Sequence, residues 1–203
     1  MHIKSIQIIQ VITYNEIIKK QTYKHLYFID LNEILTLVEG SNHSLRALEY
    51  VSNLLGSVPE DSGPGKSELL PKHEMIILTV LQPFILSKEV IKNFESMGQG
   101  RKKLLDKYLK DIYSVMQTEW IKKLSSLKSK YNKIGLAIST KIITGSHSSR
   151  FIAYTIVKFA EDKGIDLIVV GSVGTGGISK NKSLGSVTRN IAEISTSPVL
   201  IVP

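Results

Sequence analysis

Residues 166–188 read Asp166-Leu-Ile-Val-Val-Gly-Ser-Val-Gly-Thr-Gly-Gly-Ile-Ser-Lys-Asn-Lys-Ser-Leu-Gly-Ser-Val-Thr188. The apolar run up to Val170 is typical of a buried strand, and a helical pattern opens after Gly185. Glycines between a strand and a helix let the backbone approach an anion, and the N–H groups of a helix N-terminus attract negative charge. We therefore predict a phosphate cradle between Gly171 and Thr188.

Polar side chains in this segment favour the same chemistry. The hydroxyls of Ser186 and Thr188 can bond to phosphate oxygens, and Lys180 and Lys182 place positive charge in the loop. The segment is neither a P-loop nor a GxGxxG dinucleotide motif. The alternative is that its glycines serve only tight turns between a strand and a helix, and the residues alone leave that alternative open.

Outward from this segment, short apolar runs alternate with longer helical patterns, which predicts βαβ units and a doubly wound parallel sheet. Several runs are continuous in Ile, Leu and Val, as expected for strands covered on both faces. The five predicted strands are Glu33 to Val38, Met75 to Leu81, Gly135 to Ile143, Asp166 to Val170 and Pro198 to Val202.

The helices are predicted from apolar residues that recur every three or four positions. One helix follows Asn42 as its N-cap and buries Leu45, Leu48, Val51 and Leu55; others span Ser149 to Asp162 and Ser186 to Thr196. A longer helix spans about Arg101 to Tyr131. Its expected core positions are Leu105, Tyr108, Leu109, Ile112, Met116, Trp120, Leu124 and Leu127.

Two regions stand outside this alternation. The segment Gly56 to Lys72 is rich in Gly, Pro, Ser and charged residues and is expected to form a surface loop. Residues 1–32 precede the first βα unit, so we treat them as an N-terminal extension to a domain that spans 33–203. A docked strand, a docked helix and a poorly ordered tail all remain open for this extension.

Composition narrows the classes of function. The net charge is +8, and residues 86–133 hold twelve Lys and Arg against five Asp and Glu. We interpret that region as a solvated helix face, because nucleic-acid binding would need interleaved aromatic residues and arginines. No apolar run approaches the roughly 20 residues of a membrane span. The chain has no cysteine, which fits a cytoplasmic protein.

The motifs resemble those of the universal stress proteins. Gly171-x-x-Gly174, followed by Gly185-Ser186, a helix and the strand Pro198 to Val202, is similar to the family's ATP-binding signature G-x2-G-x9-G-[ST]. The first strand and helix after Glu33 also resemble the family's. This chain has ten residues between Gly174 and Gly185 where the signature has nine, and Glu39 stands where the family commonly has Asp.

The resemblance implies a fold, a ligand and an assembly. The fold is an adenine nucleotide alpha hydrolase-like sheet with strand order 3-2-1-4-5. The ligand is ATP or ADP, which Mg²⁺ can accompany. The assembly is a homodimer through Pro198 to Val202, whose apolar edge invites strand pairing. Carried over by position, the nucleotide-binding residues are Glu39, Val80, Val170, Gly171, Gly174, Gly185, Ser186, Val187 and Thr188.

Three functions follow as hypotheses. The first is a regulatory nucleotide-binding protein of the stress response, and the second is a nucleotide-free dimeric scaffold. The third is a slow ATPase or phosphotransferase, for which the segment offers no general base. The five histidines show no zinc-ligand spacing, and the GxSxG motif of serine hydrolases is absent.

Overall fold

The computed structural model describes residues 9–11, 31–56, 73–132, 136–145, 147–174 and 184–203. Six parallel strands form one sheet in the order β1-β6-β5-β2-β3-β4. The strands are β1 (Ile9–Val11), β2 (Glu33–Leu37), β3 (Glu74–Leu81), β4 (Ala137–Thr144), β5 (Leu167–Gly171) and β6 (Val199–Val202). The five predicted strands and their order are confirmed, and β1 is added at the outer side of β6.

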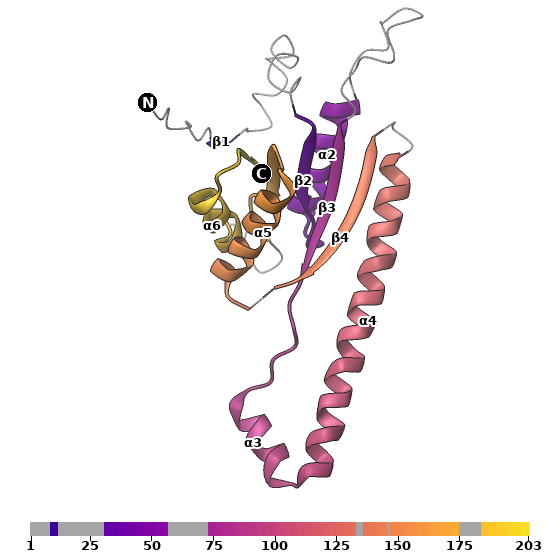
Figure 1. Ribbon diagram of the computed structural model, residues 1–203, viewed down its shortest axis with the longest axis vertical. Coiled ribbons are helices and arrows are strands. Elements are labelled where there is room, and N and C mark those ends of the chain that lie inside the picture. Colours follow the sequence, from indigo (N-terminus) through magenta and orange to yellow (C-terminus); the bar gives the residue numbers. More distant parts are fainter. Residues whose placement is uncertain (1–8, 12–30, 57–72, 133–135, 146, 175–183) are drawn as a thin grey trace, which may run out of the picture.

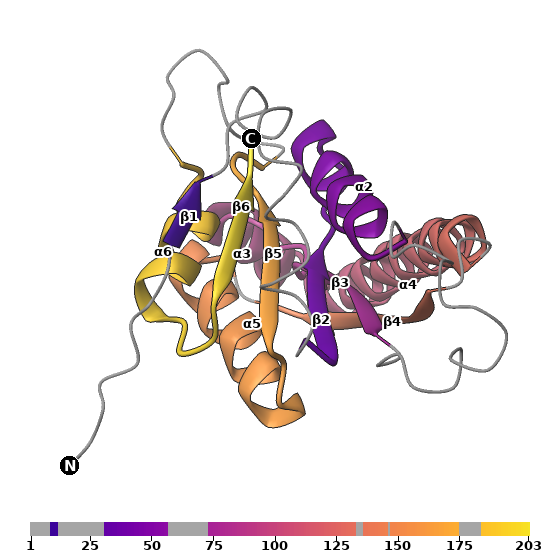
Figure 2. The same cartoon turned by 90° about the horizontal axis from the view of Figure 1, so that it is seen from above.

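Helices cover both faces of the sheet, as Figure 2 shows from above. The helices are α2 (Asn42–Gly56), α3 (Lys88–Ser96), α4 (Gln99–Asn132), α5 (Ser149–Lys163) and α6 (Ser186–Ile194). One apolar core joins α2 and the C-terminal half of α4 to residues such as Ile34 and Val38 of the β2 segment. A second core joins α5 and α6 to Leu35 and Leu37. The alternation along β2 follows from the two-residue period of a strand.

The start of α2 differs from the prediction. The backbone N–H of Ser44 donates to Oγ of Ser41 at 3.1 Å, so Ser41 rather than Asn42 is the N-cap. Leu48, Val51 and Leu55 are buried as predicted, but Leu45 is 39% exposed and Ala47 takes its place in the core. The apolar stripe of this helix is therefore rotated slightly from the sequence-based assignment.

The outer edge of β6 is occupied. Strand β1 runs parallel to β6, with Ile9 opposite Val199 and Val11 opposite Ile201, and the two strands lie side by side in Figure 2. The expectation that Pro198 to Val202 forms the edge of the sheet is therefore wrong. The physical reason is that β1 pairs with the main-chain groups that an edge strand leaves unpaired.

Helix α4 reaches beyond the sheet, which corrects the predicted core. With 34 residues it is about 51 Å long, roughly twice the length of an eight-residue strand. Among the eight expected core positions only Leu124 is buried, while Tyr108 and Ile112 are 57% and 44% exposed. Figure 1 shows α3 and the N-terminal half of α4 projecting past the ends of the strands. Helix α3 was not predicted from the sequence.

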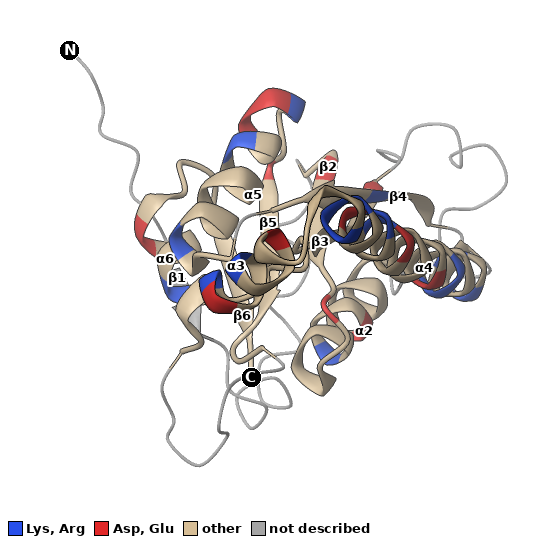
Figure 3. Ribbon diagram, turned by 90° about the horizontal axis from the view of Figure 1, so that it is seen from below, with Lys and Arg blue, Asp and Glu red and all other residues tan. Residues whose placement is uncertain are grey.

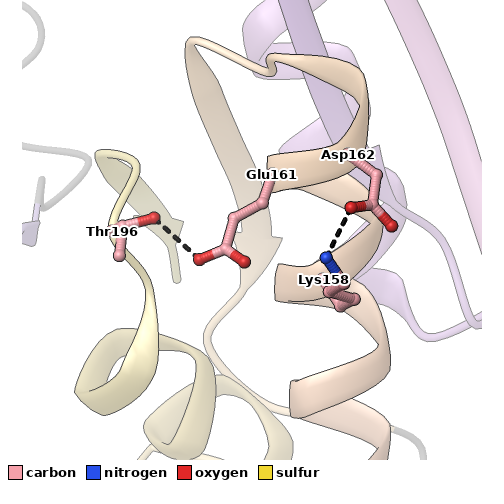
Figure 4. A network of polar contacts seen from close by, with 4 residues as sticks. All are labelled: Lys158, Glu161, Asp162 and Thr196. Atoms are coloured by element: carbon pink, nitrogen blue, oxygen red, sulfur yellow. Dashed lines mark hydrogen bonds and ion pairs between the residues drawn. The ribbon is translucent and has the colours of Figure 1, made fainter.

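Polar contacts fix the ends of several elements. The carboxylate of Asp166 accepts the backbone N–H groups of Asn32 and Glu33 at 2.8 and 3.0 Å, which ties the start of β2 to β5. At the end of α5, Lys158 pairs with Asp162 at 2.6 Å, and Thr196 donates to Glu161 at 3.1 Å (Figure 4). The ion pair lies within α5, and the bond from Thr196 joins α5 to the turn between α6 and β6. Among the described helices, none is long and apolar enough to cross a membrane.

Candidate functional site

The sheet reverses its winding between β2 and β5, and a cavity of about 610 Å³ lies at that point. Open α/β sheets bind ligands at such switch points, beyond the carboxyl ends of the strands. The nine residues predicted from the sequence all line this one cavity: Glu39, Val80, Val170, Gly171, Gly174, Gly185, Ser186, Val187 and Thr188. Folding thus brings together residues that lie up to 149 positions apart in the chain.

The turn after β2 forms one wall of the cavity. Gly40 has φ +90°, a left-handed conformation that favours glycine, and a Cβ there would lie 3.6 Å from the ring of Trp120 in α4. Oγ of Ser41 donates a hydrogen bond to Oε1 of Glu39. The same hydroxyl oxygen caps α2 by accepting from Ser44. Glu39 is therefore held at the end of β2 by the residue that starts the next helix.

The close packing of α2 on the end of β5 requires glycine at position 171. A Cβ on Gly171 would lie 2.7 Å from the carbonyl carbon of His43 and 2.8 Å from the backbone nitrogen of Ser44. Both atoms belong to the first turn of α2, and backbone cannot rotate aside as a side chain can. The first glycine of the loop therefore lets α2 pack against the end of β5, in addition to any role toward a ligand.

The glycine-rich loop is closed at its base. The N–H of Gly185 donates to the carbonyl oxygen of Ser172 at 2.8 Å. A Cβ on Gly185 would lie 3.4 Å from the backbone of Val173 and Gly174, which is a tight contact. Oε1 of Glu39 would be 3.7 Å from a Cβ on Gly174, so this residue has room. The base of the loop thus places Gly174 beside the carboxylate of Glu39.

Helix α6 points its N-terminus into the cavity. Its N-cap is Gly185, which has no side chain to bond the first N–H groups of the helix. These groups and the helix dipole provide positive potential at Ser186 and Val187. The hydroxyl of Thr188 is buried and donates to the carbonyl oxygen of Gly171 at 2.8 Å, so its proton is committed to the protein. Ser186 is exposed and keeps its hydroxyl available to a ligand.

The rest of the lining is mainly apolar and was not predicted as site. Leu37 and Leu78 contribute from the sheet, Leu184 from the segment before α6, Ile191 from α6, and Ile152 and Ile156 from α5. Their sequence signal is only that of core residues, because the helical spacing that buries Ile152 and Ile156 says nothing of a neighbouring cavity. Gln82, just after β3, adds an amide that the sequence analysis also missed.

The charge of the described site is simple. Among the described residues that line the cavity, Glu39 is the single ionisable side chain, so the positive potential in this part of the site comes from backbone N–H groups and α6. In the part of the chain that the structure describes, no group of three or more Asp, Glu or His could hold a metal ion. Gly176, Gly177, Lys180, Lys182 and the extra loop residue lie outside the described residues.

Comparison with known proteins gives a consistent result. Residues 71–203 match the model of the universal stress protein family. The chain is 28% identical over 171 residues to universal stress protein YxiE of Bacillus subtilis, which covers 84% of this chain and 98% of the relative. It is 29% identical over 133 residues to universal stress protein MJ0577 of Methanocaldococcus jannaschii, covering 66% of this chain and 78% of that protein.

Solved structures show the same fold. The structure of MJ0577 covers 85% of this chain and 95% of its own length, with a TM-score of 0.60 and 24% identity. The structure of UspA of Lactobacillus plantarum covers 85% of this chain and 98% of its own length, with a TM-score of 0.54 and 16% identity. The matched strand order, the signature residues at the switch point and the family model agree: this chain belongs to the universal stress protein family.

Proposed function

We propose that this protein binds an adenine nucleotide, ATP or ADP, at the cavity between β2, β5 and α6, and that it acts as a regulator in the stress response. The observation that carries the proposal is that all nine signature-derived residues line one cavity at the N-terminus of α6. A volume of about 610 Å³ is within the range of small-molecule sites. The absence of cysteine fits a cytoplasmic setting, where ATP is available.

The lining of the cavity offers groups that suit both the base and the phosphates of a nucleotide. Glu39, Val80 and the neighbouring apolar side chains provide a surface that suits a flat base, and the Glu39 carboxylate can accept a hydrogen bond from an amino group. Gly185, Ser186 and the first N–H groups of α6 suit the phosphates. If Mg²⁺ accompanies the nucleotide, phosphate oxygens and water would supply most of its ligands.

The direct test is calorimetric titration of the purified protein with ATP and with ADP, together with mass spectrometry of small molecules released on denaturation. We expect saturable binding of an adenine nucleotide and weaker binding of adenosine, because adenosine lacks the phosphates that α6 would hold. Failure to bind at millimolar nucleotide would leave the nucleotide-free scaffold as the better description.

The proposal extends to a homodimer through Pro198 to Val202. The three residues of β1 hold the outer edge of β6 in this structure, and a short parallel pairing is weaker than a longer antiparallel one. A second copy would form the dimer by displacing β1 and adding its own β6 to the exposed main-chain groups. The N-terminal extension then competes with the second copy for one sheet edge.

Removal of residues 1–30 is therefore expected to strengthen self-association through β6. The cut retains Leu31, which packs on the core, and Asn32, whose N–H bonds Asp166. Light scattering coupled to size-exclusion chromatography should show the dimer at concentrations about tenfold lower than for the full chain. In the pairing of β6 with β1, Leu200 lies opposite Gln10, so the cut removes the residue that faces Leu200. The side chain of Leu200 itself is buried. A shortened chain whose self-association is no stronger than that of the full chain would contradict the competition.

A further inference from the structure

The arm formed by α3 and the N-terminal half of α4 carries an exposed apolar surface. Ten of the thirteen large hydrophobic side chains exposed among the described residues lie between Phe84 and Ile121. The arm projects from the rest of the domain (Figure 1) and is far from the cavity residues Gly185 and Ser186 in sequence. Such a concentration of exposed apolar side chains marks an interaction surface.

Four of these side chains form a continuous stripe on α4. Leu104, Tyr108, Ile112 and Val115 follow one another at steps of four, four and three residues and are 44% to 59% exposed. This spacing places them on one side of the helix. The side chains that α4 buries in the domain, Leu124 and Tyr131, lie in its other half. We name the four residues the α4 stripe.

Charged residues of opposite sign flank the two ends of the α4 stripe. Arg101 precedes it and Glu119 follows it, and the two residues are about five full turns apart, so they share the side of the helix that carries the stripe. Both are exposed, and neither forms an ion pair within the part of the chain that the structure describes. Among the described residues, the guanidinium of Arg101 donates a hydrogen bond to the sulfur of Met97, at 3.1 Å.

This arrangement is complementary to itself. When two copies of α4 lie antiparallel about a two-fold axis near residue 110, Leu104 faces Val115 of the second copy and Tyr108 faces Ile112 of the second copy. In the same register Arg101 lies opposite Glu119 of the second copy, at both ends of the pair. An isologous contact needs this pairing of each residue with a complementary one at an equal distance from the axis. We infer that the α4 stripe is a homodimer interface formed by antiparallel α4 helices.

The charges argue against an anionic membrane as the occupant. Asp111 and Glu119 lie beside the α4 stripe, where they would be repelled by acidic headgroups. Lys103, Lys107 and Lys110 occupy a different face of α4, and Figure 3 shows blue and red segments distributed around this helix. Glu95 of α3 forms an ion pair with Lys102 of α4 at 2.6 Å. The hydrogen bond from Lys102 and the negative charge of Glu95 raise the pKa of Lys102.

The absence of cysteine from the chain allows a direct test of the register. Leu104→Cys and Val115→Cys are made as separate variants of the full chain and oxidised mildly, alone and as an equimolar mixture. The mixture should form disulfide-linked dimers that contain one copy of each variant, at a yield at least about tenfold above either variant alone. Cross-linking of each variant with itself would overturn the antiparallel register, and no cross-linking in any sample would overturn the interface.

Substitutions test the energetics of the same contact. Ile112→Asp should weaken the association measured by sedimentation at least about 30-fold, because a charge replaces a central apolar group. Ile121→Asp is the matched control, since Ile121 is 51% exposed on α4 but lies off the α4 stripe. Arg101→Glu should weaken the association about tenfold, and adding Glu119→Arg to that variant should restore the association. Equal effects of Ile112→Asp and Ile121→Asp, or no restoration by the second charge change, would overturn the inference.

The same experiments separate this contact from the proposed dimer through β6. The cysteine pair and the charge pair lie only on α4, at the other side of the sheet from β6. Loss of nucleotide binding or of the β6 contact would leave their outcome unchanged. A chain with both contacts would form assemblies larger than a dimer, which light scattering reports as a mass above that of two copies.

Discussion

Replacing Ser186 with glutamate is expected to lower the affinity for ATP by about 100-fold, or about 2.7 kcal/mol. Ser186 is the first residue of α6 and lines the cavity where the phosphates are proposed to lie. A carboxylate there would use the positive potential of the helix N-terminus and repel the phosphates. Isothermal titration calorimetry with ATP measures the change.

Ser186→Glu is also expected to affect stability, and here the effect is favourable. A glutamate in the first turn of a helix stabilises the helix by about 0.3–1 kcal/mol, so denaturant unfolding should show a fold at least as stable as that of the wild type. Asn53→Glu is the control for the effect on ATP affinity. It adds the same charge at an exposed position near the C-terminal end of α2. Unchanged ATP affinity in Ser186→Glu would show that the phosphates do not lie at α6.

The second large effect concerns stability. Gly171→Ala is expected to lower the free energy of unfolding by about 1–3 kcal/mol, the usual cost of overpacking a core. The added Cβ would lie 2.7 Å from the carbonyl carbon of His43 and 2.8 Å from the nitrogen of Ser44. Relief requires moving the first turn of α2 away from β5, which also disturbs Glu39 and Ser41. Urea unfolding followed by circular dichroism measures the loss.

Gly174→Ala is the matched control. It makes the same chemical change three residues later, but its nearest neighbour would be Oε1 of Glu39 at 3.7 Å, an ordinary contact. Its φ is not positive, so alanine meets no backbone strain there. We expect its free energy of unfolding to stay within about 0.5 kcal/mol of the wild type. Similar losses in both variants would show that loop conformation, rather than packing on α2, demands glycine at position 171.

The sequence and the structure agree where local chemistry settles the outcome. Continuous apolar runs predicted the central strands correctly, because a strand covered on both faces needs apolar side chains at every position. The spacing of Ile152 and Ile156 gave α5 in the same way. The signature from Gly171 to Thr188 gave the switch-point residues, since a strand, a glycine-rich loop and a helix must meet there in this topology.

The disagreements arise where only the surroundings decide. Tyr108 and Ile112 repeat at the spacing of core residues, yet α4 outgrows the sheet and leaves them exposed. Ile9 to Val11 is too short a segment for a strand assignment, and it becomes one because β6 offers an open row of main-chain groups. The sequence predicts that the hydroxyl of Thr188 bonds phosphate, but in the structure this hydroxyl donates to the carbonyl oxygen of Gly171.

The amino-acid sequence by itself determined the alternation of strands and helices, because this depends on periodicity. The winding of the sheet and the nine residues that border the cavity followed from the resemblance of its motifs to those of the universal stress proteins. Tertiary structure alone decided which hydroxyls are already bonded and which glycine touches backbone. It also decided which apolar face of α4 remains uncovered. These properties depend on distances between residues far apart in the chain, such as Gly171 and His43, and no local pattern encodes such a distance.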